Sequence, residues 1–146
     1  KEVNMKKLLL FTFIFVTTMN FTFARDKIIS PKELPEAVQS FLQKNFPNSA
    51  VKYAEKEFSE YEVHLEDGTE ISIRKNAHWE SIKSRNPIPD TLLPKVAAEY
   101  ISTEYPEDFI REIEKNLFDY EVKLSSGWEL RFKTNGSFSG ILDFDD

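Results

Sequence analysis

The sequence predicts an α+β fold of two tandem repeats, each a helix packed on a four-stranded antiparallel β-meander. The first observation behind this prediction is a duplication. At an offset of 59, positions 34–82 align with 93–141, and 13 of these 49 pairs are identical. The second is that each copy shows apolar residues at helical spacing and then alternating apolar residues, the periods of a helix and of strands.

The two helices are predicted from apolar stripes bounded by prolines. The first stripe starts at Leu34-Pro35 and ends before Pro47, and the second starts at Leu93-Pro94 and ends before Pro106. The apolar face of the sheet is the only surface that can bury them. The stripe residues are Leu34, Val38, Phe41, Leu42 and Phe46, then Leu93, Ala97, Tyr100, Ile101 and Tyr105.

A β-hairpin follows in each copy, over Tyr61–Ile73 and Tyr120–Phe132. Its apolar residues share one face only when the loop between the strands holds three residues. Such a loop needs a left-handed third residue, and Gly68 and Gly127 stand at that position. The sequence therefore predicts positive φ at both glycines, and charged residues on the opposite, outer face of each hairpin.

A last strand closes each copy, after turns that contain Asn76-Ala77 and Asn135-Gly136. Interpreted as two-residue turns, they place Trp79 and Phe138 on the outer face among charged residues. Exposed aromatic residues beside Arg or Lys are typical of protein interfaces. The alternatives are that Trp79 packs against the linker or the other repeat, or that a bulge turns it inward.

The N-terminus is predicted to be a signal peptide over residues 1–24, of which residues 1–4 precede the expected start at Met5. Two lysines precede an apolar run from Leu8 to Val16, which is short for a membrane-spanning helix. Cleavage would leave a periplasmic or secreted protein with no stable membrane anchor. The predicted domains are repeat 1 over 30–84, a proline-containing linker over 85–92, and repeat 2 over 93–143.

Composition and motifs exclude several classes of function. The net charge of −6 argues against nucleic-acid binding, which needs a basic surface. There is no cysteine and no Gly-x-Ser-x-Gly motif, so we expect no catalytic residues, no cofactor and no enzyme activity. Glu62, His64 and Glu70 share the outer face of the first hairpin. The second copy has Lys123 in place of His64, so no metal site is predicted there.

Several short motifs occur twice behind the expected signal peptide. They are Leu-Pro, Phe/Tyr-Pro, Glu-Lys, Tyr-Glu-Val-x-Leu-x-x-Gly-x-Glu and Asn-Ala/Gly-x-aromatic. Because these motifs occur in this order, the chain resembles the β-lactamase-inhibitor-like, PepSY-like family of exported bacterial proteins over about residues 30–143. The resemblance implies tandem repeats, an envelope or extracellular location and no enzyme activity. The family name records likeness to a secreted inhibitor that binds β-lactamases with a sheet face. This chain lacks cysteines, unlike that inhibitor, so inhibition does not carry over.

Two functions are therefore expected, from different classes. The first is an exported, non-catalytic module that binds an envelope or extracellular protein and inhibits or regulates it. The residues predicted for its binding face are Arg74, Trp79, Glu121, Lys123, Arg131 and Phe138. The alternative is a small-ligand or cation-binding periplasmic sensor or buffer that acts through Glu62, His64 and Glu70.

Overall fold

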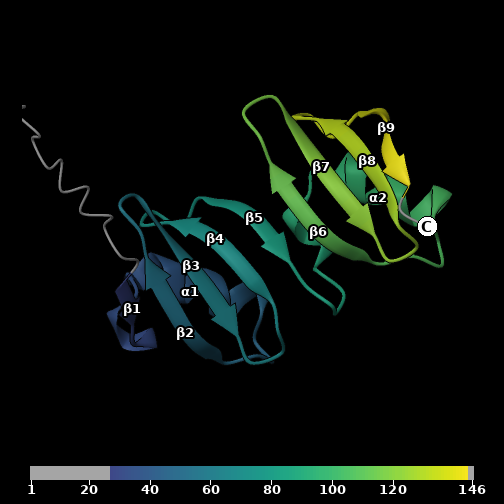
Figure 1. Ribbon diagram of the computed structural model, residues 1–146. Helices are drawn as coiled ribbons and strands as arrows, with labels where there is room; N and C mark the ends of the chain where they lie inside the picture. The colour runs from purple at the N-terminus through teal and green to yellow at the C-terminus, as the bar shows by residue number, and fades with distance from the viewer. Residues whose placement is uncertain (1–26, 145–146) are drawn as a thin grey trace, which may run out of the picture.

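The computed structural model describes residues 27–144, and the predicted signal peptide lies outside these residues (Figure 1). The strands are β1 (Lys27–Ile29), β2 (Val51–Lys56), β3 (Glu60–Leu65), β4 (Glu70–Arg74), β5 (Trp79–Lys83), β6 (Ile110–Lys115), β7 (Asp119–Leu124), β8 (Trp128–Lys133) and β9 (Phe138–Phe144). The helices are α1 (Glu36–Asn45) and α2 (Lys95–Glu104), and each follows a short 3-10 turn, Pro31–Glu33 or Asp90–Leu92.

All these strands form one antiparallel sheet, in sequence order from β1 to β9. The two parts of the chain join where β5 pairs with β6, with Ile82 opposite Ile113. The predicted α+β class, with two tandem repeats of a helix on a four-stranded meander, is therefore wrong. The fold is mostly β, because a nine-stranded sheet runs through the whole described chain and two ten-residue helices accompany it.

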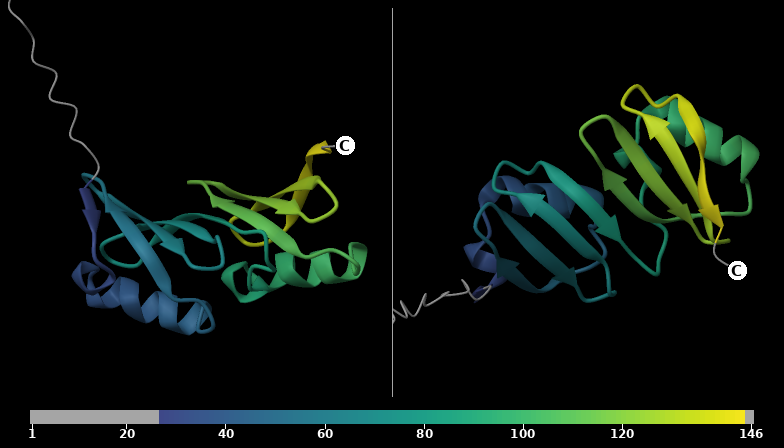
Figure 2. Two further views of the ribbon diagram at one scale, coloured as in Figure 1. Left: turned by 60° about the horizontal axis from the view of Figure 1, so that its bottom comes forward. Right: turned by 45° about the horizontal axis from the view of Figure 1, so that its top comes forward.

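Both helices lie against the same face of the sheet (Figure 2). Proline directly precedes each helix, at Pro35 and Pro94, and each helix ends one residue before a Phe or Tyr that is followed by proline. Proline is accepted at a helix start but blocks helical geometry in the residue before it. These prolines fix the length of the helices, and thereby how much of the sheet the helices cover.

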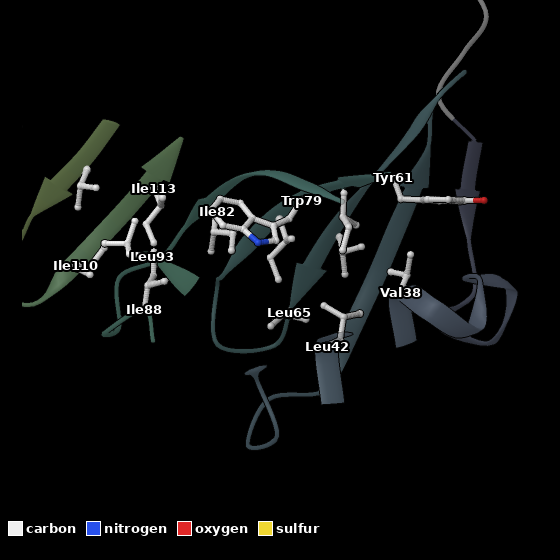
Figure 3. Packing of buried hydrophobic residues seen from close by; sticks show 14 of the residues in the cluster. Val38, Leu42, Tyr61, Leu65, Trp79, Ile82, Ile88, Leu93, Ile110 and Ile113 are labelled. Carbon is white, nitrogen blue, oxygen red and sulfur yellow. The ribbon is translucent and has the colours of Figure 1, made fainter. Parts of the chain in front are cut away.

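The helix-covered face of the sheet holds the core (Figure 3). Val38 and Ala97, one from each helix, are fully buried against strand residues such as Ile71 and Leu130. The core passes through the join between β5 and β6, where Ile82 and Ile113 are also fully buried. It is continuous across both parts of the sheet.

The register of both central hairpins agrees with the prediction. Val63 lies opposite Ile71, and Val122 lies opposite Leu130. Gly68 and Gly127 have φ of 85° and 101°, which confirms the three-residue loops with a left-handed third residue. Within β2, a bulge beside Val51 accounts for the broken alternation in the sequence of that strand.

The turn between β4 and β5 differs from the prediction. The amide of Arg74 donates a hydrogen bond to the carbonyl of His78 (2.9 Å), so the loop holds three residues, and Ala77 takes the left-handed position with φ of 62°. A two-residue turn would have paired Arg74 with Trp79. The extra loop residue shifts this register by one, so Trp79 lies opposite Ile73 and points to the core.

The turn between β8 and β9 repeats this geometry with Gly136 in the left-handed position, and Phe138 lies opposite Phe132. An extra residue after Trp79 in β5, and one after Phe138 in β9, then restore the alternation. A second register shift in β9 lies beyond Ile141. Ile82 and Ile141 thus lie opposite Ile71 and Leu130, as predicted. The predicted strand pairing was therefore wrong only at these two turns and at the aromatic residue that follows each.

Gly136 gives a test of this turn. A Cβ atom added there would lie 2.8 Å from the Pro94 Cβ and 3.0 Å from the Ala97 nitrogen, whereas one added at Gly68 would meet nothing within 4 Å. Both glycines have left-handed φ, so strain alone would cost about 1 kcal/mol in either variant. We expect Gly136→Ala to lower the free energy of unfolding by roughly 1–3 kcal/mol more than Gly68→Ala, measured by urea titration. Equal losses would contradict the packing of this turn against α2.

Candidate functional site: the outer face of the sheet

The outer face is the sheet face opposite the helices, and Figure 2 shows that neither helix covers it. Alternation along the strands places charged and polar side chains here, while their neighbours enter the core. Residues of this face on the central strands are Glu62, His64, Glu70, Lys83, Glu112, Glu114, Glu121, Lys123, Glu129 and Arg131.

His64 lies at the centre of the outer face of the first half. Its ring stacks on Tyr53 of β2, with 4.4 Å between centroids. The Nε2 atom lies 3.4 Å from a Glu62 oxygen, and Nδ1 lies 3.9 Å from a Glu70 oxygen. The two ring nitrogens thus face two different carboxylates, so the structure brings together the three residues that the sequence placed on this face.

A hollow of about 480 Å³ opens beside the join between β5 and β6, at the edge that carries the β7–β8 turn. Three basic residues line it: Lys83, Arg111 and Lys123. The Lys83 Nζ atom lies 3.6 Å from a Glu112 oxygen across the join. Because Lys83 and Arg111 belong to opposite sides of the join, only the continuous sheet brings these basic side chains together.

The turn that forms the far wall of this hollow is held by Asp108. One carboxylate oxygen accepts hydrogen bonds from the Ser125 hydroxyl and the Ser126 amide, both at 2.8 Å. The other oxygen accepts from the Ser126 hydroxyl, also at 2.8 Å. Such charge-assisted bonds fix the turn relative to the end of α2, and so fix the shape of the hollow.

Next to the basic hollow lies an acidic one of about 110 Å³, lined by Glu112, Glu114, Glu121 and Glu129 together with Lys123. Burial, and then the negative charges of the other three glutamates, raise the pKa of Glu114. Among the described residues, no group of three or more His, Cys, Asp and Glu side chains is arranged to hold a metal ion. The acidic hollow therefore offers negative charge without a formed metal site.

The second half of the face is ordered by Arg131. Its guanidinium donates a hydrogen bond to Glu121 (2.9 Å), and its Nε atom lies 3.5 Å from an Asp119 oxygen. Glu121 and Arg131 form the cross-strand pair that the hairpin register predicted. Arg74 similarly contacts Glu80 in the first half. Four of the six predicted binding residues, Arg74, Glu121, Lys123 and Arg131, thus belong to the outer face.

The other two, Trp79 and Phe138, lie on the helix-covered face, so their predicted placement on the outer face is wrong. Trp79 is only 8% exposed, and the Lys115 Nζ atom lies 5.4 Å from the centre of its ring. Phe138 stacks on Tyr100 of α2, with 4.5 Å between centroids. The cause is the three-residue turn before each strand, which turns both aromatic residues inward.

Sequence reasoning missed the basic hollow and its residues Lys83, Arg111 and Ser125. Arg111 and Lys83 are separated by the linker and α2, and no local pattern predicts that their strands pair. The only signal in the sequence was the alternation of Ile110 and Ile113, which is broken by a bulge beside Ile110.

Glu60, on the outer side near the β2–β3 turn, gives a pH-dependent prediction. A hydrogen bond with Glu80, then burial and the charges of Glu80 and Glu57, raise its pKa from the ordinary 4.5 to about 7. The folded state therefore binds more protons than the unfolded state between these values, so this group makes stability fall as pH rises from 4.5 to 7.

Replacing Glu60 by Gln removes this titration. We expect the difference in urea midpoint between Glu60→Gln and the parent to rise from pH 5 to pH 8. The same difference for the exposed control Glu107→Gln should not change with pH. A difference between Glu60→Gln and the parent that is the same at both pH values would contradict the carboxyl pair.

Three solved structures of similar fold are described as putative periplasmic proteins. One is described as a "putative periplasmic protein" of Bacteroides vulgatus, with 29% identity, a TM-score of 0.75 and coverage of 83% of this chain and 99% of that chain. A second, a "putative calcium-regulated periplasmic protein" of Bacteroides thetaiotaomicron, has 29% identity, a TM-score of 0.74 and coverage of 81% and 97%. A third, a "putative periplasmic protein of unknown function" of Bacteroides vulgatus, has 27% identity, a TM-score of 0.73 and coverage of 81% and 99%.

These neighbours define the class: a periplasmic or secreted protein built on one antiparallel sheet. The model of the family described as "Putative beta-lactamase-inhibitor-like, PepSY-like" matches the chain twice, over residues 20–76 and 59–139, and the chain belongs to this family. No curated protein sequence matches it. Within residues 27–144, neither helix has the length and apolar character needed to cross a membrane.

Proposed function

We propose that this protein is an exported, non-catalytic module that binds another envelope or extracellular protein through the outer face of its sheet. The observation that carries the proposal is the join of β5 and β6. It makes one broad, uncovered face out of the two halves, and it brings two hollows together beside the join, the basic one at the edge that carries the β7–β8 turn.

The charges on this face suit recognition of a protein surface. A basic hollow, with Lys83 and Arg111, adjoins an acidic one that contains Glu114 and Glu129. A partner must therefore present acidic and basic groups in matching order, and such complementarity fixes orientation and excludes wrong partners. The hydrogen-bonded Asp108 turn and the Arg131 ion pairs hold this pattern in place before binding, which lowers the entropy lost on association.

Family membership supports a binding role over a catalytic one, because the family description refers to likeness to an inhibitor and names no reaction. Whether binding inhibits or regulates the partner depends on what the partner's covered surface does. The proposal concerns the face, and it assigns binding to the charged residues Arg74, Glu121, Lys123 and Arg131 together with the basic hollow.

Site-specific photo-crosslinking in periplasmic extract tests this proposal. A photoreactive residue at Ser72, on the outer face, should give a discrete covalent adduct, and one at Gln43, on the exposed side of α1, should give none. The double variant Lys83→Glu/Arg111→Glu should lose the Ser72 adduct, while Lys44→Glu on α1 retains it. Adducts formed equally from Ser72 and Gln43, or unaffected by the double variant, would overturn the outer-face assignment.

A second candidate function is cation or small-ligand binding through Glu62, His64 and Glu70. It is favoured by one observation, the calcium regulation in the description of the Bacteroides thetaiotaomicron structure. Calcium prefers oxygen ligands, which Glu62 and Glu70 offer. A saturable rise in melting temperature with calcium, lost in Glu62→Gln/Glu70→Gln, would support this function; an unchanged melting temperature would exclude it.

A further inference from the structure

The apolar residues most exposed to solvent gather at one edge of the sheet. In an antiparallel sheet every second turn falls at the same edge, so the β2–β3, β4–β5, β6–β7 and β8–β9 turns lie together along the upper side of Figure 1. We call this the turn edge: residues 57–59, 75–78, 116–118 and 134–137, with the strand residues that adjoin them. Phe58 is 100% exposed, Leu117 81% and Phe118 79%.

These three side chains project from the tips of two hairpins in equivalent places. Phe58 and Leu117 are related by the offset of 59 residues that relates the two halves of the sequence. Single exposed apolar residues are common on protein surfaces, but large ones gathered at one edge mark a contact site. Burial of these side chains on a partner would remove a large apolar area from water.

The charge of the turn edge is opposite to that of the protein. With Lys27, which lies opposite Lys56, and Glu80, which contacts Arg74, the strand ends and turns there carry six basic residues and four acidic ones, a net charge of +2, in a chain with a net charge of −6. The basic residues are Lys27, Lys56, Arg74, Lys75, Lys115 and Lys133, and the acidic residues are Glu57, Glu60, Glu80 and Asp119. The turn edge is thus more basic than the chain as a whole, so an anionic surface attracts it.

The chain also enters the sheet at this edge. Lys27, the first residue of β1, lies opposite Lys56, the last residue of β2. Lys27 therefore adds its positive charge to the turn edge.

We propose that the turn edge binds reversibly to an anionic lipid surface, with Phe58, Leu117 and Phe118 between the headgroups and the lysines against the phosphates. Exposed apolar side chains on separate hairpin turns suit a lipid surface, which adapts to their shape, better than a protein partner, which must offer a matching pocket. Basic residues near an anionic leaflet add attraction that is strongest within a Debye length. This association is peripheral and adds no membrane anchor.

Vesicle co-sedimentation tests the proposal with the chain from Arg25 to Asp146, which contains the whole described sheet and excludes the apolar run that would bind lipid by itself. We expect binding to vesicles of phosphatidylcholine with phosphatidylglycerol, and much weaker binding to phosphatidylcholine alone. The variant Phe58→Ser/Leu117→Ser/Phe118→Ser should bind roughly tenfold or more weakly. Its melting temperature should match that of the parent, since these side chains are exposed.

Matched controls separate the two contributions. Lys56→Glu/Lys75→Glu/Lys133→Glu should abolish the preference for phosphatidylglycerol, and Ile141→Ser, an exposed apolar position on the β9 edge, should leave binding unchanged. Absence of binding to anionic vesicles at low salt would overturn the proposal and assign the tips to a protein partner. Equal binding of the parent and the triple serine variant would overturn it as well.

Discussion

Trp79→Ala is expected to lower the free energy of unfolding by about 3–5 kcal/mol, the usual loss for a buried aromatic residue. The Trp79 side chain is 8% exposed, its ring lies 6.3 Å from the ring of Tyr120, and Lys115 covers it. Tyr120 belongs to the second half of the sheet, so the truncation removes packing between the halves. Thermal unfolding followed by circular dichroism should show a fall of roughly 10 °C or more.

Phe138→Ala is the matched control for Trp79→Ala, because Phe138 occupies the equivalent place in β9 and is partly exposed. We expect a smaller loss there, since Phe138 packs on Tyr100 and Phe132 but is 36% exposed to solvent. If Trp79→Ala left the melting temperature unchanged while Phe138→Ala lowered it, the inward orientation of Trp79 would be wrong.

Ile113→Asp is expected to prevent folding or to lower the free energy of unfolding by more than about 4 kcal/mol. Ile113 is fully buried opposite Ile82 at the join of the two halves, where a carboxylate would have no compensating partner in the surrounding core. Because the core is continuous across this join, both halves should unfold together. Calorimetry of Ile113→Asp should show either one transition at a lower temperature than in the parent, or no transition.

Ile141→Asp introduces the same charge at a position related to Ile82 by the sequence repeat. Ile141 is 52% exposed, because β9 is the last strand of the described sheet, whereas Ile82 in β5 pairs with strands on both sides and is fully buried. We expect a change within about 1 kcal/mol for Ile141→Asp. If Ile113→Asp and Ile141→Asp lowered the free energy of unfolding by similar amounts, the join would be no more buried than the edge of the sheet.

Local features of this fold were predictable from the sequence because local physics determines them. Gly68 and Gly127 stand where only a left-handed residue closes a three-residue loop, and the alternation of Val63 and Ile71 then sets the register. Prolines bound both helices. The turn before Trp79 was mispredicted because a non-glycine residue, Ala77, takes the left-handed position, which few residues other than Gly, Asn and Asp adopt.

The continuous sheet was not predictable in the same way. The pairing of β5 with β6 joins residues separated by the linker and α2, and no local pattern in the sequence specifies it. The charged outer face could be inferred from alternation alone, and Arg74, Glu121, Lys123 and Arg131 lie there. The basic hollow could not, because Lys83 and Arg111 come together only across the join.

Native-state hydrogen exchange at the join tests the central claim of a single nine-stranded sheet most directly. The amides of β5 and β6 that pair across the join should exchange only through global unfolding, with the same free energy and denaturant dependence as those in the middle of β3 and β7. Exchange at the join through a smaller, separate opening, while the two central hairpins remain protected, would show two independent sheets and contradict this structure.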